Sequence, residues 1–300
     1  MNFIYTVFTD PGLVFLKYSL LAGILSSFAF GITGSYVVVR KISYIAGAIS
    51  HSVLGGIGLA LYIQTRADIK WMTPYTGAVF ASILAAFLIW LAEKYAKERL
   101  DSILGALWST GMAAGIIFIS LTPGYINPMS YLFGNILMVT KSDLVIIGIF
   151  SLFICIVSLL FQNKLIATSF DEEFMETRKV NTDLYKLLIL LMTSLTIVLM
   201  IRIVGIIMII ALLTIPPAAA SRFSWNFSVM TVLSVIFSIF FVVTGIGISF
   251  KYNLPGGPSI ILVAGFFYFL VLILKSWKFT SLIFIKIFNF FLREKRNENP

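Results

Sequence analysis

The chain has few of the residues from which soluble surfaces and most active sites are built. Of its 300 residues only 12% are charged, and there is one histidine and one cysteine, whereas 59% are hydrophobic. A lone cysteine, Cys155, excludes a disulfide framework. So little charge also excludes a soluble globular domain, and the composition predicts an all-α membrane protein that crosses the bilayer many times.

Motifs of the common enzyme classes are missing as well. The sequence has no Gly-Lys-Ser/Thr phosphate loop, no two-histidine metalloprotease motif and no Gly-x-Ser-x-Gly elbow. We therefore expect no enzyme and no bound cofactor, and the chain cannot hydrolyse ATP by itself through a phosphate loop. The net charge of +9 comes from Lys and Arg residues that flank apolar runs, so we expect a lipid bilayer and no nucleic acid as partner.

What the chain does contain is a series of apolar runs. A helix needs roughly 20 apolar residues to cross the hydrocarbon core. Runs of about this length predict a polytopic bundle of about eight to nine transmembrane helices, near 13–39, 42–64, 75–92, 102–121, 143–162, 184–200, 203–221, 226–249 and 259–277. The sixth and seventh runs are almost continuous, so one of them should be short or re-entrant. We also expect a break in the eighth at Gly245 or Gly247.

The distribution of Lys and Arg predicts the orientation. Most of them fall on one side of the predicted spans, and basic loops stay in the cytoplasm, so the N-terminus should be outside and the C-terminus inside. Residues 1–277 then form one transmembrane domain. Residues 278–300 form a cytoplasmic or interfacial tail, because their apolar part is too short to cross a bilayer.

His51, the only histidine, lies within the second apolar run. A polar side chain at bilayer depth is costly, so it marks a transport pathway or a buried partner. Neutral imidazole is the commonest protein ligand of transition metals, but one histidine supplies only one ligand. Two interpretations stay open: a transient contact with a transported metal ion, or a structural histidine bonded to a backbone carbonyl or serine hydroxyl.

Small residues surround His51 on the same run. They are Gly47, Ser50, Ser52, Gly55 and Gly56. Small side chains at helical spacing let helix backbones approach closely in lipid. We therefore expect this helix to lie at the centre of the bundle, with these residues lining the pathway or packing beside it.

Three further residues interrupt apolar runs. Arg202 either extends its side chain to the outer interface or faces a water-filled vestibule. Pro216 and Pro217 remove backbone donors and break a helix. The carbonyls they free must be satisfied by protein or line a cavity; the other interpretation is a simple helix end near the inner face.

Two connecting segments also stand out. Residues 122–142 are too short to cross the bilayer. They form either a gate or short interfacial helix, or an ordinary connector. In the most charged loop, Ser169 and Glu172 fit a capping box, and Asn181 fits a helix stop. We therefore predict a short cytoplasmic helix over 169–180 that either docks into a soluble partner or is merely solvated.

Five segments in this order resemble a known family. They are Ala46-Gly47-Ala48-Ile49-Ser50-His51, Tyr131-Leu132-Phe133-Gly134-Asn135-Ile136-Leu137, Phe170-Asp171-Glu172-Glu173-Phe174, Arg202-Ile203-Val204-Gly205 through Ile215-Pro216-Pro217-Ala218, and Leu254-Pro255-Gly256-Gly257-Pro258. Together they cover most of the chain. The chain is similar to the membrane permease subunits of bacterial ABC importers for zinc, manganese and iron.

This resemblance implies a type II ABC importer-like permease in the bacterial cytoplasmic membrane. It implies a homodimer or paired permease with alternating access at the dimer interface, two ATP-binding cassette ATPase subunits and an extracytoplasmic solute-binding protein. The helix with Phe170, Asp171, Glu172, Glu173 and Phe174 would be the coupling helix that contacts the ATPase. His51 matches the family's histidine in the second span.

One position departs from the family pattern. Many members have an aspartate one turn before the histidine, and this chain has Gly47 there. The resemblance therefore implies an incomplete metal pair, with His51 as its remaining member. Two alternatives remain at this point: an ABC permease for a chelated metal, siderophore or cofactor, and a self-contained secondary cation transporter. The second usually buries a carboxylate at depth, and no intramembrane carboxylate is evident here.

Overall fold

The computed structural model describes Val7 and residues 9–69, 71–95, 100–123, 134 and 139–275. Within these residues all regular structure is helical. A short 3-10 helix, η1 (Pro11–Leu13), is followed by α2 (Val14–Val39), α3 (Ser43–Ala67), α4 (Pro74–Tyr95), α5 (Leu100–Leu121), α7 (Lys141–Phe170), α8 (Glu172–Thr177), α9 (Thr182–Val204), α10 (Ile206–Ala220) and α11 (Phe227–Tyr252). A final described helix covers Gly256–Lys275.

The predicted helical membrane bundle is confirmed. Eight of the described helices are long and apolar enough to cross a bilayer, and α10, with 15 residues, is shorter. The near-continuous sixth and seventh runs are α9 and α10, and the chain breaks between them at Gly205, whose φ of 79° suits glycine. One of the two is thus short, as the sequence predicted.

The expected break in the eighth span is wrong. α11 runs without interruption through Gly245 and Gly247. Gly245 instead allows a close approach, because a Cβ there would lie 2.6 Å from the Cα of Ile260 on the final described helix. Glycine at this position removes bulk between two packed helices rather than ending one of them.

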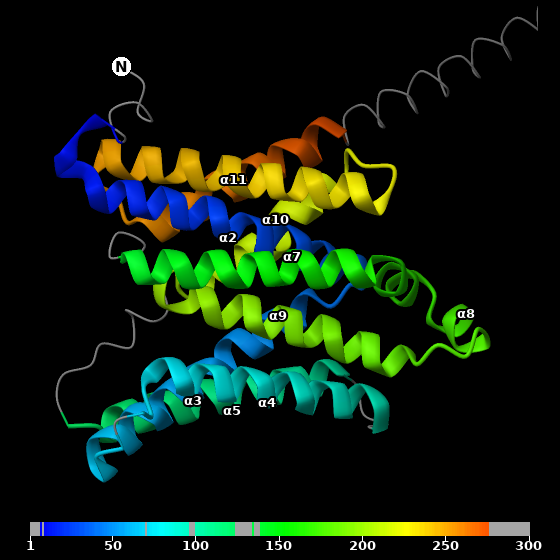
Figure 1. Ribbon diagram of the computed structural model, residues 1–300, viewed down its shortest axis with the longest axis horizontal. Helices are drawn as coiled ribbons and strands as arrows, with labels where there is room; N and C mark the ends of the chain where they lie inside the picture. Colours follow the sequence, from blue (N-terminus) through cyan, green and yellow to red (C-terminus); the bar gives the residue numbers. More distant parts are fainter. Residues whose placement is uncertain are drawn as a thin grey trace, which may run out of the picture.

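The arrangement of the helices places α3 deep in one half of the bundle. α3 packs between α4 and α5, and α2 packs against α7, α10 and α11, while α9 contacts both groups. Figure 1 shows α3, α4 and α5 together at the lower side, with α9 between them and the rest. Twelve of the 25 residues of α3 are buried, among them Ile45–His51, so the part of the helix that carries His51 is enclosed by its neighbours in this half of the bundle.

Close packing around α3 depends on glycine. A Cβ on Gly58 would lie 2.5 Å from the carbonyl oxygen of Gly115 on α5, and one on Gly55 would lie 2.8 Å from that of Gly111. On the other face, Gly56 and Gly77 of α4 are in equally tight contact. The small residues of the sequence therefore serve backbone-to-backbone packing, which gains dispersion energy in lipid, where the hydrophobic effect is absent.

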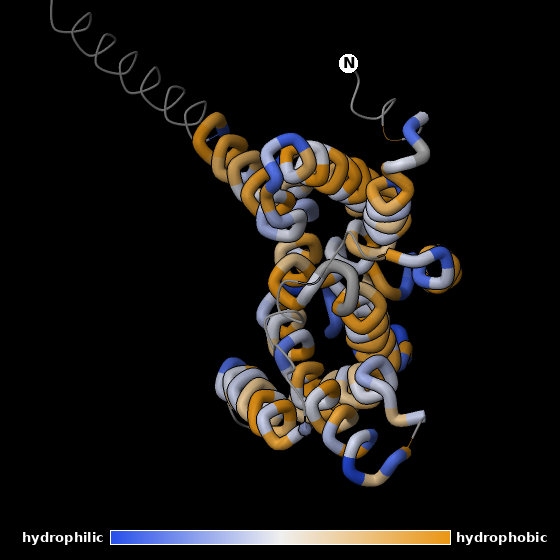
Figure 2. The backbone as a smooth tube through the Cα atoms, turned by 90° about the vertical axis from the view of Figure 1, so that its left-hand side faces the viewer, coloured by the Kyte–Doolittle hydropathy of each residue, from blue (hydrophilic) through white to orange (hydrophobic). Residues whose placement is uncertain are grey.

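Large apolar side chains cover the outer surface of the bundle. On α7 they are Val145, Ile149, Leu152, Phe153, Ile156, Leu159 and Leu160. Figure 2 views the helices nearly end-on and shows hydrophobic colour along their outer sides. Such a surface is stable only in lipid, so this is a multi-pass membrane protein.

The prolines of α10 do not break it. Pro216 and Pro217 lie inside the helix and are buried, and the helix continues to Ala220. A proline frees the carbonyl four residues earlier, and for Pro217 this is Leu213. That carbonyl lies against Gly34 of α2, which has no side chain to keep it away. The freed group is covered by protein at this contact.

Some predicted features lie outside the described residues. They are most of the 122–142 connector, the side chain of Arg202 and the 278–300 tail.

Candidate functional site

His51 lies on the first half of α3, and its side chain is 8% exposed. Its neighbours Ser50 and Ser52 do not bond to it: Ser50 Oγ donates to the Ala46 carbonyl at 2.7 Å, and Ser52 Oγ donates to that of Ala48 at 2.7 Å. Serine in a membrane helix satisfies itself in this way. The imidazole Nδ1 is buried and has no hydrogen-bond partner among the described residues.

An aromatic ring from another helix covers the imidazole. Trp108 of α5 stacks on His51, with ring centroids 4.3 Å apart and an angle of 13° between the planes. The indole is 37% exposed, whereas His51 is 8% exposed, so Trp108 reaches the surface of the chain and His51 does not. Trp108 is the site residue that sequence reasoning missed, because nothing in the spacing of α5 reports a contact with α3.

Gly47 makes the stacked arrangement possible. A Cβ on Gly47 would lie 3.0 Å from the Cζ3 atom of the Trp108 ring, closer than ordinary van der Waals contact. The indole thus occupies the space into which a side chain at position 47 would extend. The position that departs from the family pattern is filled by a side chain of α5.

The ligand set around His51 is small. No group of three or more His, Cys, Asp or Glu side chains lies close enough to hold a metal in the part of the chain that the structure describes. A stable zinc site takes four ligands. One imidazole with a free nitrogen can give a passing ion a weak and short-lived contact, which suits transfer better than storage.

The outer face of α5 differs from the other outer faces. Over the first half of the helix its exposed residues include Ser102, Gly105, Ala106, Ser109 and Ala113, whereas Ile116, Ile117 and Leu121 are exposed further along. On α7 the corresponding face carries large apolar side chains. A stripe of small and weakly polar residues is poor lipid-facing surface but is typical of a helix that packs on another helix or borders water.

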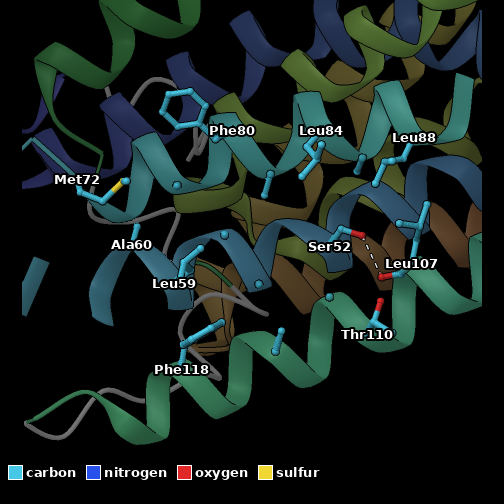
Figure 3. Close-up of a pocket in the computed structure, with 17 residues that line it drawn as sticks. Ser52, Leu59, Ala60, Met72, Phe80, Leu84, Leu88, Leu107, Thr110 and Phe118 are labelled. Atoms are coloured by element: carbon cyan, nitrogen blue, oxygen red, sulfur yellow. Dashed lines mark hydrogen bonds between the residues drawn. The ribbon is translucent and has the colours of Figure 1, made fainter. Parts of the chain in front are cut away.

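Ser52 lies beside a cavity of about 370 Å³ between α3, α4 and α5. Ser52 Oγ also donates to the Leu107 carbonyl at 3.1 Å, and Figure 3 shows this bond at the edge of the cavity. The remaining lining is almost wholly apolar, with side chains such as Phe80, Leu84 and Phe118. The lining contains no His, Cys, Asp or Glu, so the cavity is not a candidate site for zinc, manganese or iron.

The predicted helix over 169–180 exists in a shorter form. Phe170 is the last residue of α7, and α8 covers only Glu172–Thr177. The cap is not Ser169, whose hydroxyl donates to Leu165 within α7. Asp171 caps α8 instead, accepting from the Phe174 N–H at 2.9 Å, because its carboxylate can reach the free amides of the first turn.

The expected stop at Asn181 is also wrong. Its side chain accepts from the Leu184 N–H, so Asn181 begins α9 instead of ending α8. Lys179, with a φ of 58°, lies in the turn that follows α8.

The end of α7 and α8 together expose aromatic side chains next to acidic residues. Phe170 is 65% exposed and Phe174 50% exposed, whereas Met175 is buried and anchors the helix. Glu173 is exposed, and Glu172 forms an ion pair with Lys186 of α9. Figure 1 shows α8 projecting beyond one end of the bundle. Large exposed aromatics outside the apolar band indicate a surface for another protein.

Ion pairs gather at the same end of the bundle. Arg40, at the end of α2, lies 3.7 Å from Glu93 of α4, and both side chains are nearly buried. Lys94 of α4 pairs with Asp183 of α9 at 2.7 Å. With the pair of Glu172 and Lys186, these contacts connect α8 through α9 and α4 to the turn before α3.

The comparisons with known proteins agree with this architecture. The model of the ABC 3 transport family matches residues 13–275. The chain belongs to this family. It is 38% identical over 265 residues to a probable metal transport system membrane protein of Chlamydia pneumoniae, covering 88% of this chain and 90% of that one.

Two further relatives cover a similar share of the chain. The high-affinity zinc uptake system membrane protein ZnuB of Buchnera aphidicola is 36% identical over 248 residues, covering 82% of this chain and 92% of ZnuB. The solved structure of PsaBC from Streptococcus pneumoniae is similar with a TM-score of 0.78 and 29% identity, covering 90% of this chain and 94% of that one. The predicted family and fold are confirmed.

Proposed function

We propose that this chain is the membrane permease of an ATP-driven importer for a divalent transition metal: zinc, manganese or iron. The observation that carries the proposal is the imidazole of His51, buried within a membrane helix with Nδ1 unpartnered. The names of relatives, a metal transport system protein and a zinc uptake protein, support the same class of substrate. The metal is the substrate, and the chain holds it only in passing.

The pathway follows the exposed face of α5. Trp108, which covers His51, lies on this helix among small and weakly polar residues such as Gly105 and Ser109. A second copy of the chain packs with the same face toward it, since small residues favour close helix pairing in lipid. The two copies then border one path, with a His51 from each.

Energy reaches the bundle through α8. Phe170 and Phe174 enter a pocket of the ATPase subunit, with Asp171 fixing the helix and Glu172 tying it to α9. This end faces the cytoplasm, with the N-terminus outside, in agreement with the distribution of Lys and Arg. The opposite end receives the metal from a solute-binding protein. Chemistry on ATP belongs to the partner and not to this chain.

The transport step is alternating access. Closure of the ATPase subunits moves α8, and the ion pairs at its end of the bundle carry the movement to α4 and the start of α3. A single imidazole binds the metal weakly, so release is fast once the path opens inward. Gly55 and Gly56 let α3 slide against its neighbours without side chains in the way.

The test replaces the imidazole. His51→Ala should lower uptake of radioactive zinc or manganese at limiting metal by at least tenfold, in vesicles that hold the permease, its ATPase and its binding protein. Co-purification of the ATPase should not change, because His51 lies far from α8 in sequence and on a different helix. Normal uptake by this variant would end the pathway role of His51.

A further inference from the structure

Trp108 covers His51 on one side of the imidazole ring. Trp108 stacks on one face of the imidazole and is itself 37% exposed on α5, where its exposed neighbours are small residues. His51 is 8% exposed and its Nδ1 is buried without a partner. An ion that moves along α5 therefore meets the indole before it meets the imidazole.

Gly47 provides the space for the covering position of the ring. A Cβ on Gly47 would lie 3.0 Å from the ring atom Cζ3 of Trp108. Even a methyl group there would press on the indole. Because position 47 has no side chain, the ring lies flat on His51 without being displaced.

A second position for the ring is available on α5 itself. Long side chains in a helix point back over the turn before them, which for Trp108 is the turn containing Gly105. A Cβ on Gly105 would have no heavy atom within 4 Å, so the space above it is open. This open turn is the side toward which the indole of Trp108 turns when it leaves His51.

We propose that Trp108 is the gate of the metal path at His51: the indole closes on the imidazole over Gly47 and opens by turning over Gly105. The proposal rests on the proposed function, in which His51 contacts the metal. Trp108 is a positioning residue, since it controls access to the ligand and does not itself bind the ion. The structure shows the closed position.

The first test uses the fact that His51 is the only histidine. Diethyl pyrocarbonate acylates exposed neutral imidazole, and mass spectrometry of the His51 peptide gives the rate in the purified complex with the ATPase, on a chain without a histidine tag. Trp108→Ala should raise this rate at least tenfold. Trp71→Ala, which removes an indole that is 62% exposed on another segment, should leave the rate unchanged.

A second variant leaves the indole present and changes the residue beneath it. Gly47→Ala leaves Trp108 present but puts a methyl group 3.0 Å from its ring, so it should also raise the acylation rate, by several-fold. Wild-type rates in both Trp108→Ala and Gly47→Ala would overturn the gate. Because this readout needs no transport, it fails or succeeds independently of the metal.

A third variant blocks the open position. Gly105→Leu fills the space above Gly105 and should lower metal uptake at least tenfold while His51 stays as slow to acylate as in the wild type. Gly265→Leu is the matched control, since a Cβ on Gly265 also meets nothing within 4 Å. Wild-type uptake by Gly105→Leu would overturn the gate, whereas wild-type uptake by His51→Ala would overturn only the proposed role of His51.

Discussion

Lys94 and Asp183 join α4 to α9 by an ion pair of 2.7 Å. The indole N–H of Trp90, one turn earlier on α4, donates to the Asp183 carbonyl at 3.1 Å, so two bonds fix the same junction. α9 also holds α8 through Lys186, and α4 packs tightly on α3 through Gly77. The pair therefore lies between the proposed ATPase contact and the helix that carries His51.

Removing this ion pair should affect coupling more than stability. Each of the two side chains is about one third exposed, so Lys94→Met should leave the Tm of the chain almost unchanged. The metal transported per ATP hydrolysed should fall about fivefold, the factor that corresponds to about 1 kcal/mol of coupling. Parallel uptake and ATPase assays give this ratio. The control is Lys251→Met, in the last turn of α11, which should keep the wild-type ratio. An unchanged ratio in Lys94→Met would show that this ion pair does not contribute to coupling.

Phe174→Glu should release the ATPase. Phe174 is 50% exposed on α8, and a charge there would have to be buried at the interface without a partner. We expect at least tenfold less ATPase to co-purify with the chain, while the chain itself stays folded because the residue makes little buried contact. Trp71→Glu places the same charge on an exposed aromatic at a different segment and should keep the wild-type yield. Equal yields of co-purified ATPase for both variants would show that α8 is not part of the interface with the ATPase.

Gly58→Ala should destabilise the bundle. The added methyl would lie 2.5 Å from the Gly115 carbonyl oxygen, which belongs to backbone and cannot rotate away. Overpacking of this kind costs about 1–3 kcal/mol, which should appear as a lower Tm in detergent. Gly265→Ala has open space and gains helix propensity, so its Tm should be equal or higher. A Tm for Gly58→Ala that matches this control would refute tight packing of α3 on α5.

Much of the fold could be predicted from apolar runs, because each helix in lipid must satisfy its own backbone and cover it with apolar side chains. The helix ends were less predictable. α7 extends to Phe170 because Asp171 takes the capping role that the pattern suggested for Ser169. Pro217 fits inside α10 because Gly34 of α2 receives the freed carbonyl, and a contact between distant helices leaves no local signal.

The site was predictable only where its features lie within one helix. His51 and its flanking glycines are visible in one helix, and their close packing follows from spacing alone. That Gly47 makes room for Trp108 depends on the register between α3 and α5, which no periodicity within either helix contains. The ion pairs near α8 likewise join helices that are far apart in sequence.

The most direct test of the whole account is accumulation of radioactive zinc or manganese in vesicles against a gradient. The chain reconstituted alone should not concentrate the metal under any ion or proton gradient, and adding the ATPase, the binding protein and ATP should produce accumulation that stops when ATP is exhausted. Accumulation by the chain alone would contradict the account.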